Sequence, residues 1–524
     1  MNLDLADIQG NILTAYGKLG FPKGRVLLFH VADPTAGRAF VERLRPLVTT
    51  ALRWPSRKQV ETGEVVVPRP EVTLNVAFTF RGLLALGLPV RTLRGMPDEF
   101  IDGMAARARV LGDDFPLDSP ARWDRVWRQE GPDRTVHVLV MLNAQADAAG
   151  QALPALDAMT KLLRALPAQV GGGVALLAGH GPDGADLQEL TAIYEPAPDG
   201  GVQPTPREHF GFVDAISDPV FHGQLPEHKA RERAVGGGKL DRKGRWTPLA
   251  TGEFLLGYPD EAQEIAGAAM PLDFSRNGTF FAYRKLHQNT GAFAAFLDAA
   301  APRFGANVGV DDPAEARMFL MAKMSGRWPD GVPLEAFPTL DSWKKVTAVA
   351  RAAVVADPRA LNDFTYGGDP QGVRCPMGAH VRRMNPRDAL DPLGPAKPGG
   401  PAGSALNNRR RILRRGLPYG DAGAADGEHG IVFMAVCASL FRQFEFVQQQ
   451  WLNYGLDFNS GNDTCPLVGN HPPGEKFVIP GDGAGAPYIL DRLPQLVETR
   501  GGDYFFKPSL TALRMIGQGL VDPT

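Results

Sequence analysis

Two segments in the N-terminal third alternate apolar and polar positions with a period of two. The segment "VTLNVAFTF" places every second residue from Val72 to Phe80 on one face, and "TVHVLVML" repeats the alternation from Val136 to Leu142. Such an alternation is typical of half-buried strands. The apolar "RVLLFHVAD" at 25–33 adds a third predicted strand.

Helical spacing lies between these predicted strands. The segment "MPDEFIDGMAARARVLGD" starts with proline and acidic residues and carries Phe100, Met104, Ala108 and Leu111 at helical spacing, with Gly112 as a stop. A second helical segment, "PTAGRAFVERLRPLV", follows the first strand. The order of strand, helix and strand is compatible with a ferredoxin-like βαβ unit.

A loop rich in proline and glycine, "YEPAPDGGVQPTPRE", predicts a domain boundary near Glu208. We expect an N-terminal ferredoxin-like domain at 1–207 and a second domain at 208–524, with a turn-rich insertion at about 225–340. The C-terminal region returns to a strand-like "GIVFMAV" and then a long helix, "SLFRQFEFVQQQWLNYG". The predicted fold class is therefore α+β.

Composition and charge narrow the class of protein. The chain has 524 residues, 44% of them apolar, and a formal net charge of −2 without long blocks of one sign, so neither nucleic acid nor a membrane is an expected partner. The longest nearly apolar run is about half of what a membrane span needs. Three cysteines are too few for a disulfide framework, and no export signal is visible at the N-terminus. We expect a cytoplasmic protein.

One histidine, His380, lies in the unusual stretch "CPMGAHVRRMNPRD". Zinc is a poor candidate because no CxxC or HExxH motif accompanies it. Haem needs only one axial donor from the protein, either a neutral imidazole or a thiolate. A lone histidine is more often structural than a ligand, and Cys375 is a rival ligand in the same stretch, so the residues by themselves leave both candidates open.

Several motifs resemble segments of the dye-decolorizing peroxidases. "GFVDAISDP" at 211–219 is similar to the GxxDG signature of that family, and "CPMGAHVRRMNPRD" resembles its proximal-histidine segment. Five further segments resemble the family in the same order: "DIQGNIL", "GEFLLGYPDE", "RNGTFFAYRKL", "RRILRRGLPYG" and "FVQQQWLN". The resemblance covers nearly the whole chain and implies two ferredoxin-like domains with antiparallel sheets and surrounding helices, as in the dimeric α+β barrel-like superfamily. It also implies that the C-terminal domain, 208–524, is the one that binds haem.

The resemblance also implies an activity and a cofactor. The expected protein is a haem peroxidase that uses hydrogen peroxide to oxidise dyes, phenols or similar organic reductants through a ferryl intermediate, with haem b (iron protoporphyrin IX). The alternative is a non-enzymatic haem-binding or haem-carrier protein on the same fold. The sequence favours no oligomeric state.

The family's functional residues carry over to matching positions. The resemblance implies that His380 is the proximal iron ligand and that Asp214 is the distal acid–base residue. Arg414, the first arginine of "RRGLPYG", would be the distal cation, with Arg415 as the alternative register. Position 215 departs from the signature, because alanine stands where the family has glycine, and glycine is needed there only if φ is positive or a group packs against the backbone.

The resemblance also implies further residues on the proximal and distal sides of the haem. Asp463 in "GNDTCPLVG" resembles the acidic residue that accepts a hydrogen bond from the proximal imidazole, and Glu445 is its competitor. Ile431 and Phe433 in "GIVFMAV" resemble the apolar residues that line the distal pocket. A second-sphere carboxylate would make the imidazole more basic.

Overall fold

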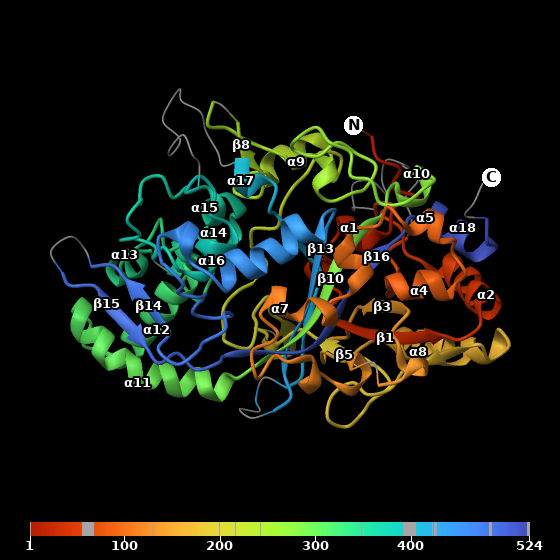
Figure 1. Ribbon diagram of the computed structural model, residues 1–524. Helices are drawn as coiled ribbons and strands as arrows, with labels where there is room; N and C mark the ends of the chain where they lie inside the picture. Colours follow the sequence, from red (N-terminus) through yellow and green to blue (C-terminus); the bar gives the residue numbers. More distant parts are fainter. Residues whose placement is uncertain are drawn as a thin grey trace.

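A large antiparallel sheet is the centre of the computed structural model of this chain (Figure 1). The structure describes residues 2–54, 68–390 without 129, 199, 215, 242 and 347, and 405–520 without 422, 424–426 and 482–484. In this part of the chain the sheet has ten strands in the order β11-β13-β10-β16-β2-β3-β1-β4, with β12 beside β13 and β5 beside β1. Its strands are β1 (Lys23–Val31), β2 (Val72–Phe78), β3 (Val138–Ala144), β4 (Val174–Leu176), β5 (Gln188–Thr191), β10 (Thr279–Gln288), β11 (Leu413–Arg414), β12 (Leu417–Tyr419), β13 (Gly430–Cys437) and β16 (Val497–Lys507).

The sheet consists of two halves. Strands β1 to β5 come from the first 207 residues, and β10 to β13 and β16 come from the rest of the chain. The halves meet where β16 pairs with β2 through Phe506 and Phe78. All strand pairs of this sheet are antiparallel, which confirms the predicted α+β class.

The predicted insertion at about 225–340 is wrong for its central part. Strand β10 lies inside that range, and it pairs with β13 on one side and with β16 on the other. The strand is hard to recognise because its second half, "RKLHQ", is polar, whereas a buried strand is expected to be apolar. The segment therefore supplies the middle of the C-terminal half of the sheet.

Two predicted helices differ from the structure. The helix expected after Met96 is divided into α6 (Asp98–Asp102), a 3₁₀ turn at Ala105–Arg107 and α7 (Ala108–Leu111), because Gly103 has a positive φ of 79°. The long C-terminal helix is wound as π-helical turns at Leu440–Glu445 and Val447–Leu452.

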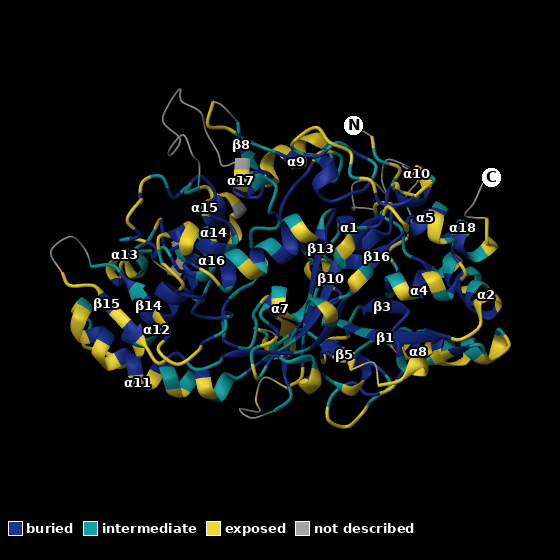
Figure 2. Ribbon diagram, viewed as in Figure 1, coloured by how far each residue is buried: buried dark blue, intermediate teal, exposed yellow. Residues whose placement is uncertain are grey.

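Helices and short hairpins surround the sheet (Figure 1). The helices α2, α4, α8 and α18 flank the N-terminal half, and the elements from α11 to α16 gather with β14 and β15 at the opposite end. Figure 2 shows buried strands at the centre and exposed outer faces on α8 and α11. The remaining bounds are α1 (Gly10–Leu13), α2 (Pro34–Leu44), α4 (Phe80–Ala85), α5 (Val90–Leu93), α8 (Pro154–Gln169), α9 (Glu227–Arg233), α10 (Leu272–Ser275), α11 (Thr290–Val308), α12 (Pro313–Ser325), α13 (Leu340–Lys345), α14 (Ala348–Ala356), α15 (Pro358–Asn362), α16 (His380–Met384), α17 (Ala405–Asn408), α18 (Leu510–Gln518), β6 (Tyr194–Pro196), β7 (Val202–Pro204), β8 (Lys239–Leu240), β9 (Trp246–Thr247), β14 (Lys476–Ile479) and β15 (Tyr488–Asp491).

Two large apolar clusters hold these layers together. One cluster takes residues from both halves of the sheet and from the helices that flank them. The other packs α11 and α12 against β14, β15 and the segment from Val447 to Val497, and it includes Phe210, Phe212 and Cys465. None of the helices in the described ranges has the length and apolar character of a membrane span.

Candidate active site

One cavity collects five of the residues predicted from the sequence. His380, Asp214, Arg414, Ile431 and Phe433 all line it. They come from α16, from the loop that precedes α9, and from strands β11 and β13. The fold therefore brings together segments that are up to 219 residues apart, from position 214 to position 433.

The arginines that follow His380 fix the short helix on which it lies. His380 is the first residue of α16. Arg382 forms a buried ion pair with Asp369 at 2.9 Å, and both side chains are at most 3% exposed. Arg383 donates hydrogen bonds to the backbone carbonyls of Trp451, Tyr454 and Asp463. These contacts hold α16 against the segment that follows the π-helical turns, so the imidazole has a defined direction into the cavity.

Cys375 does not compete with His380 in the structure. Its side chain is completely buried, and it is absent from the cavity lining. Burial raises the pKa of its thiol to about 12, which disfavours the thiolate that a metal ligand requires. Among the two candidates left open by the sequence, only His380 reaches the cavity.

Asp214 and Arg414 form an ion pair at the cavity wall. Arg414 Nη1 donates to Asp214 Oδ1, and Arg414 Nε lies 3.7 Å from Asp218 Oδ1. Burial lowers the pKa of Arg414, but Asp214 and Asp218 outweigh this effect and the net direction is upward, so the guanidinium keeps its charge. Arg415 turns away from the cavity and donates to the backbone carbonyls of Asn11 and Ile12. Of the two arginines considered from the sequence, Arg414 lines the cavity and Arg415 does not.

Glu208, which the sequence did not single out, holds the loop that carries Asp214. Its carboxylate accepts hydrogen bonds from the backbone N–H groups of Phe210 at 2.8 Å and Phe212 at 2.9 Å, and from Gln288 Nε2 at 2.5 Å. Burial raises the pKa of Glu208 to about 7. The residue was overlooked because it ends the polar stretch assigned to a domain boundary. Ala215, the departure from the family signature, lies outside the described residues.

Ile431 and Phe433 line the cavity because they alternate on β13. Val432 and Met434, the residues next to them, are at most 1% exposed and pack into the core of the sheet. The period of two along the strand directs the two sets of side chains to opposite faces. The apolar wall expected from the sequence is therefore part of this cavity.

The predicted acidic partner of His380 is not where either candidate was expected. The carboxylate of Asp463 pairs with Lys476 Nζ at 2.9 Å. Glu445 pairs with Arg107 and accepts a hydrogen bond from the Tyr504 hydroxyl at 2.8 Å. Neither acid lines the cavity.

Instead, the imidazole of His380 faces a cysteine. His380 Nδ1 lies 3.3 Å from Cys465 Sγ, within hydrogen-bond distance for sulfur. Cys465 is completely buried and lies two residues beyond Asp463. The prediction of Asp463, with Glu445 as its competitor, is corrected to Cys465.

Arg284 on β10 presents unsatisfied donors at the cavity. Its Nη2 donates to the carboxylate of Asp113 and to Thr499 Oγ1, and all three residues line the cavity. Its Nε and Nη1 are buried without a hydrogen-bond partner among the described residues. Buried N–H groups without acceptors are unfavourable, so these two nitrogens are suited to bind an anionic group.

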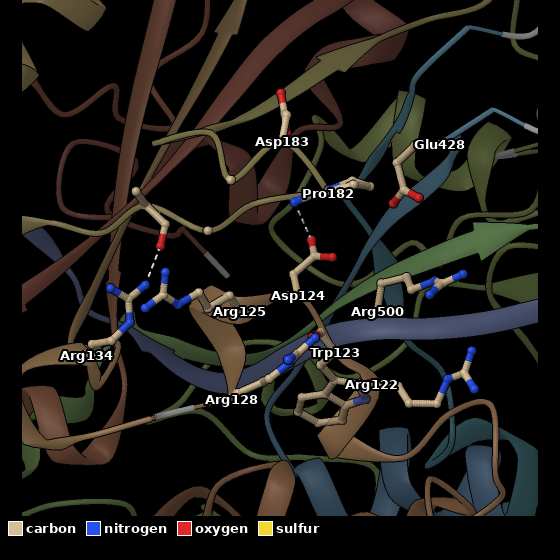
Figure 3. Close-up of a pocket in the computed structure, with 14 residues that line it drawn as sticks. Arg122, Trp123, Asp124, Arg125, Arg128, Arg134, Pro182, Asp183, Glu428 and Arg500 are labelled. Atoms are coloured by element: carbon tan, nitrogen blue, oxygen red, sulfur yellow. Dashed lines mark hydrogen bonds between the residues drawn. The ribbon is translucent and has the colours of Figure 1, made fainter.

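A second cavity, of about 490 Å³, is lined by five arginines (Figure 3). Trp123 also lines it, and its indole N–H donates to the backbone carbonyl of Asp118 at 2.7 Å. Asp118 is itself part of the wall of the first cavity. One hydrogen bond thus connects the two cavities. The five arginines are Arg122, Arg125, Arg128, Arg134 and Arg500.

Comparison with known proteins agrees with this geometry. Residues 7–162 match the DyP dimeric alpha+beta barrel domain, and residues 403–460 match the C-terminal domain of Dyp-type peroxidases. The chain belongs to the DyP-type peroxidase family. It is therefore an oxidoreductase that depends on hydrogen peroxide, and the alternative of a non-enzymatic haem carrier is not supported.

The similarity to individual DyP-type peroxidases extends over nearly the whole chain. The chain is 28% identical to the multifunctional dye peroxidase DyP2 of Amycolatopsis, with 98% of this chain and 96% of the relative covered. It is 27% identical to peroxidase 2 of Mycetinis scorodonius, with 98% and 88% covered. The crystal structure of a fungal DyP-type peroxidase from Auricularia auricula-judae shares the fold, with a TM-score of 0.71 at 22% identity and full coverage of both chains.

The residues of the first cavity fit the haem that this family implies. The single imidazole in the cavity lining suits an axial ligand, and the unpaired Arg284 nitrogens suit a propionate carboxylate. Among the described residues, no cluster of three or more His, Cys, Asp or Glu side chains could hold a metal ion without such a group.

Proposed function

We propose that this chain uses hydrogen peroxide to oxidise dyes, phenols or similar organic reductants at a haem b that His380 holds. The observation that carries the proposal is that His380, Asp214 and Arg414 line one cavity. Relatives with the same coverage include dye-decolorizing peroxidases of Mycetinis scorodonius and Auricularia auricula-judae.

The cysteines favour haem b over a c-type haem. Attachment of a c-type haem uses a CxxCH motif, and His380 is preceded by "CPMGA", with one cysteine five residues away. Cys375 is outside the cavity lining. A haem in this cavity would be held without a covalent bond, as haem b (iron protoporphyrin IX) is.

Asp214 and Arg414 have different roles in the reaction with peroxide. When bound, haem supplies the iron that activates peroxide and accepts electrons from the reductant. The Asp214 carboxylate takes a proton from one peroxide oxygen and returns it to the other, which leaves as water. Arg414 stabilises negative charge on the departing oxygen without losing its own proton. Ile431 and Phe433 keep bulky reductants away from this proton transfer.

Bulky reductants would then donate electrons from the surface. The arginine-lined cavity suits an anionic aromatic reductant, because its five guanidinium groups exceed the three carboxylates of Asp124, Asp183 and Glu428 (Figure 3). The buried ring of Trp123 lies between this cavity and the wall of the first cavity at Asp118. An electron from a bound reductant has a short path through that ring.

Spectra and turnover of three proteins test the proposal. The wild-type protein with haem should show a Soret band of the histidine type and should oxidise dyes only with peroxide. His380→Ala should lose the haem or this spectrum, and Cys375→Ala should retain both. A thiolate-type spectrum that disappears in Cys375→Ala would contradict the ligand, and a wild-type protein that binds haem but oxidises nothing would contradict the activity.

We also propose a cytoplasmic location and leave nucleic acid and membranes out of the partners. The three cysteines are free and buried, as a reducing compartment allows. Fractionation of the source cells with an antibody against the protein tests the location, and recovery from the extracellular fraction would contradict it.

A further inference from the structure

We propose that Cys465 is the positioning residue of the proximal imidazole, with its sulfur as the acceptor for the N–H of His380. The inference rests on His380 as the haem ligand of the proposed function. The distance of 3.3 Å between His380 Nδ1 and Cys465 Sγ carries it. If the other ring nitrogen, Nε2, is the one that binds iron, Nδ1 carries the proton and needs an acceptor.

Backbone contacts fix the cysteine at this place. The N–H of Cys465 donates to the carbonyl of Leu452 at 2.7 Å, and its own carbonyl accepts the N–H of Gly469 at 2.9 Å. Arg383, three residues after the histidine, donates to the carbonyl of Asp463 at 2.8 Å. The same short segment is thereby tied both to the π-helical turns and to α16, so the contact between imidazole and sulfur does not depend on a mobile side chain.

The neighbouring carboxylates are engaged elsewhere. Asp463 pairs with Lys476, and Glu475 accepts the backbone N–H of Thr464 at 2.6 Å. In the part of the chain that the structure describes, the hydrogen-bond partner of the His380 imidazole is the sulfur of Cys465. The choice of acceptor is therefore a property of position 465.

Sulfur and carboxylate act differently on a metal-bound imidazole. A carboxylate accepts a short, charge-assisted hydrogen bond, which makes the imidazole a stronger donor to the metal. Cysteine sulfur is a weaker acceptor and bonds at a longer distance. We infer that Cys465 orients the His380 ring while leaving it a weaker donor than a carboxylate would, and that the iron(III)/iron(II) potential is correspondingly higher.

Four variants of the full chain, loaded with haem, test this assignment. They are Cys465→Asp, Cys465→Ser, Cys465→Ala and the control Cys437→Ala, which removes a cysteine that is also fully buried but whose sulfur lies against the carbonyl of Ala435. Two quantities are measured: the reduction potential by spectroelectrochemistry, and the iron–histidine stretching frequency of the ferrous protein by resonance Raman.

The expected shifts have opposite signs. Cys465→Asp should lower the potential and raise the stretching frequency, and Cys465→Ala should raise the potential and lower the frequency. Cys465→Ser should stay closer to the wild type than Cys465→Ala, and Cys437→Ala should equal the wild type. Equal values in Cys465→Ala and the wild type would overturn the role of the sulfur, as would shifts of one sign in both Cys465→Asp and Cys465→Ala.

The readouts also separate this inference from the proposed function. Both quantities describe the bond between iron and imidazole and need no turnover. Loss of peroxidase activity in the wild type would contradict the proposed function but leave the order of the potentials unchanged. If Cys465→Asp fails to hold haem, the comparison of Cys465→Ala with Cys437→Ala decides by itself.

Discussion

Replacing Arg284 by methionine should weaken haem binding, and it should do so beyond the effect of removing a buried cation that does not line the cavity. Arg284 lines the cavity, and its buried Nε and Nη1 have no hydrogen-bond partner among the described residues, so they are the donors that a haem propionate would satisfy. Two hydrogen bonds to a charged group contribute about 1.5–3 kcal/mol each. Their loss would cost about 3–6 kcal/mol, which raises the haem dissociation constant by roughly 10² to 10⁴.

The variant also leaves Asp113 without its cation. Burial already raises the pKa of Asp113, and Arg284 is the main group that lowers it, so the carboxyl group should become protonated in Arg284→Met. Protonation removes the unpaired negative charge that the substitution would leave on Asp113. The free energy of unfolding should therefore fall by at most about 3–5 kcal/mol, the typical cost of breaking a buried ion pair.

Lys285→Met is the matched control for this experiment. Lys285 is the next residue on β10, is also buried, and pairs with Asp124 at 2.8 Å and Glu428 at 3.2 Å, outside the first cavity. Transfer of haem to excess apomyoglobin measures the rate of haem loss, and a titration of the apoprotein measures affinity. Equal haem affinity in Arg284→Met and Lys285→Met would refute the reasoning, because it would show that the unpaired nitrogens do not contact haem.

Five further variants, one of them a control, have definite outcomes. Asp214→Asn should keep the haem spectrum but slow the first reaction with peroxide by a factor of roughly 10² to 10⁴ in stopped-flow measurements. Arg414→Leu should slow the same step. An unchanged rate in Asp214→Asn would assign the proton transfer to another group. Arg122→Glu should raise the KM for a sulfonated dye several-fold and leave the KM for a neutral phenol unchanged. The control Arg231→Glu on α9, outside the arginine-lined cavity, should change neither KM. Equal effects of Arg122→Glu on both reductants would place the binding site of the anionic reductant elsewhere. Burial lowers the pKa of Lys507 to about 7, so the unfolded chain binds a proton between about pH 7 and 10.5 that the folded chain does not, and folding stability should rise with pH across that window. Lys507→Met should lose this rise, and its free energy of unfolding should exceed that of the wild type by at most about 5 kcal/mol below pH 7. If the free energies of urea unfolding of variant and wild type depend on pH in parallel, the lowered pKa of Lys507 is contradicted.

The sequence predicted the site residues that lie in local motifs. His380, Asp214 and Arg414 each lie in a short segment that resembles the family, and the structure brings these three segments to one cavity. Their partners lie at other places in the chain. Asp218 and Glu208 are loop residues with the composition of any turn, and their roles follow from contacts with Arg414 and with the backbone of the loop.

Strand β10 shows why a polar pattern can conceal a central strand. Arg284 and Lys285 stand side by side in "FAYRKL", and such a pair predicts an exposed edge. In the structure both are buried, because alternate residues of a strand point to opposite faces and each face of β10 offers carboxylates, Asp113 on one and Asp124 on the other. No local pattern reveals partners that lie more than 150 residues earlier in the chain.

The partner of His380 depends on tertiary register in the same way. Asp463 and Cys465 are two residues apart, and chemistry alone favours the carboxylate as the acceptor for an imidazole N–H. Arg383 takes the carbonyl of Asp463, and Lys476 on β14 takes its carboxylate, so the acid is held at the side of the segment away from the imidazole. The cysteine then occupies the remaining position against the ring. A shift of two residues in this turn therefore decides whether a carboxylate or a sulfur contacts the imidazole of His380, and with it how strongly this imidazole would donate to an iron that it binds.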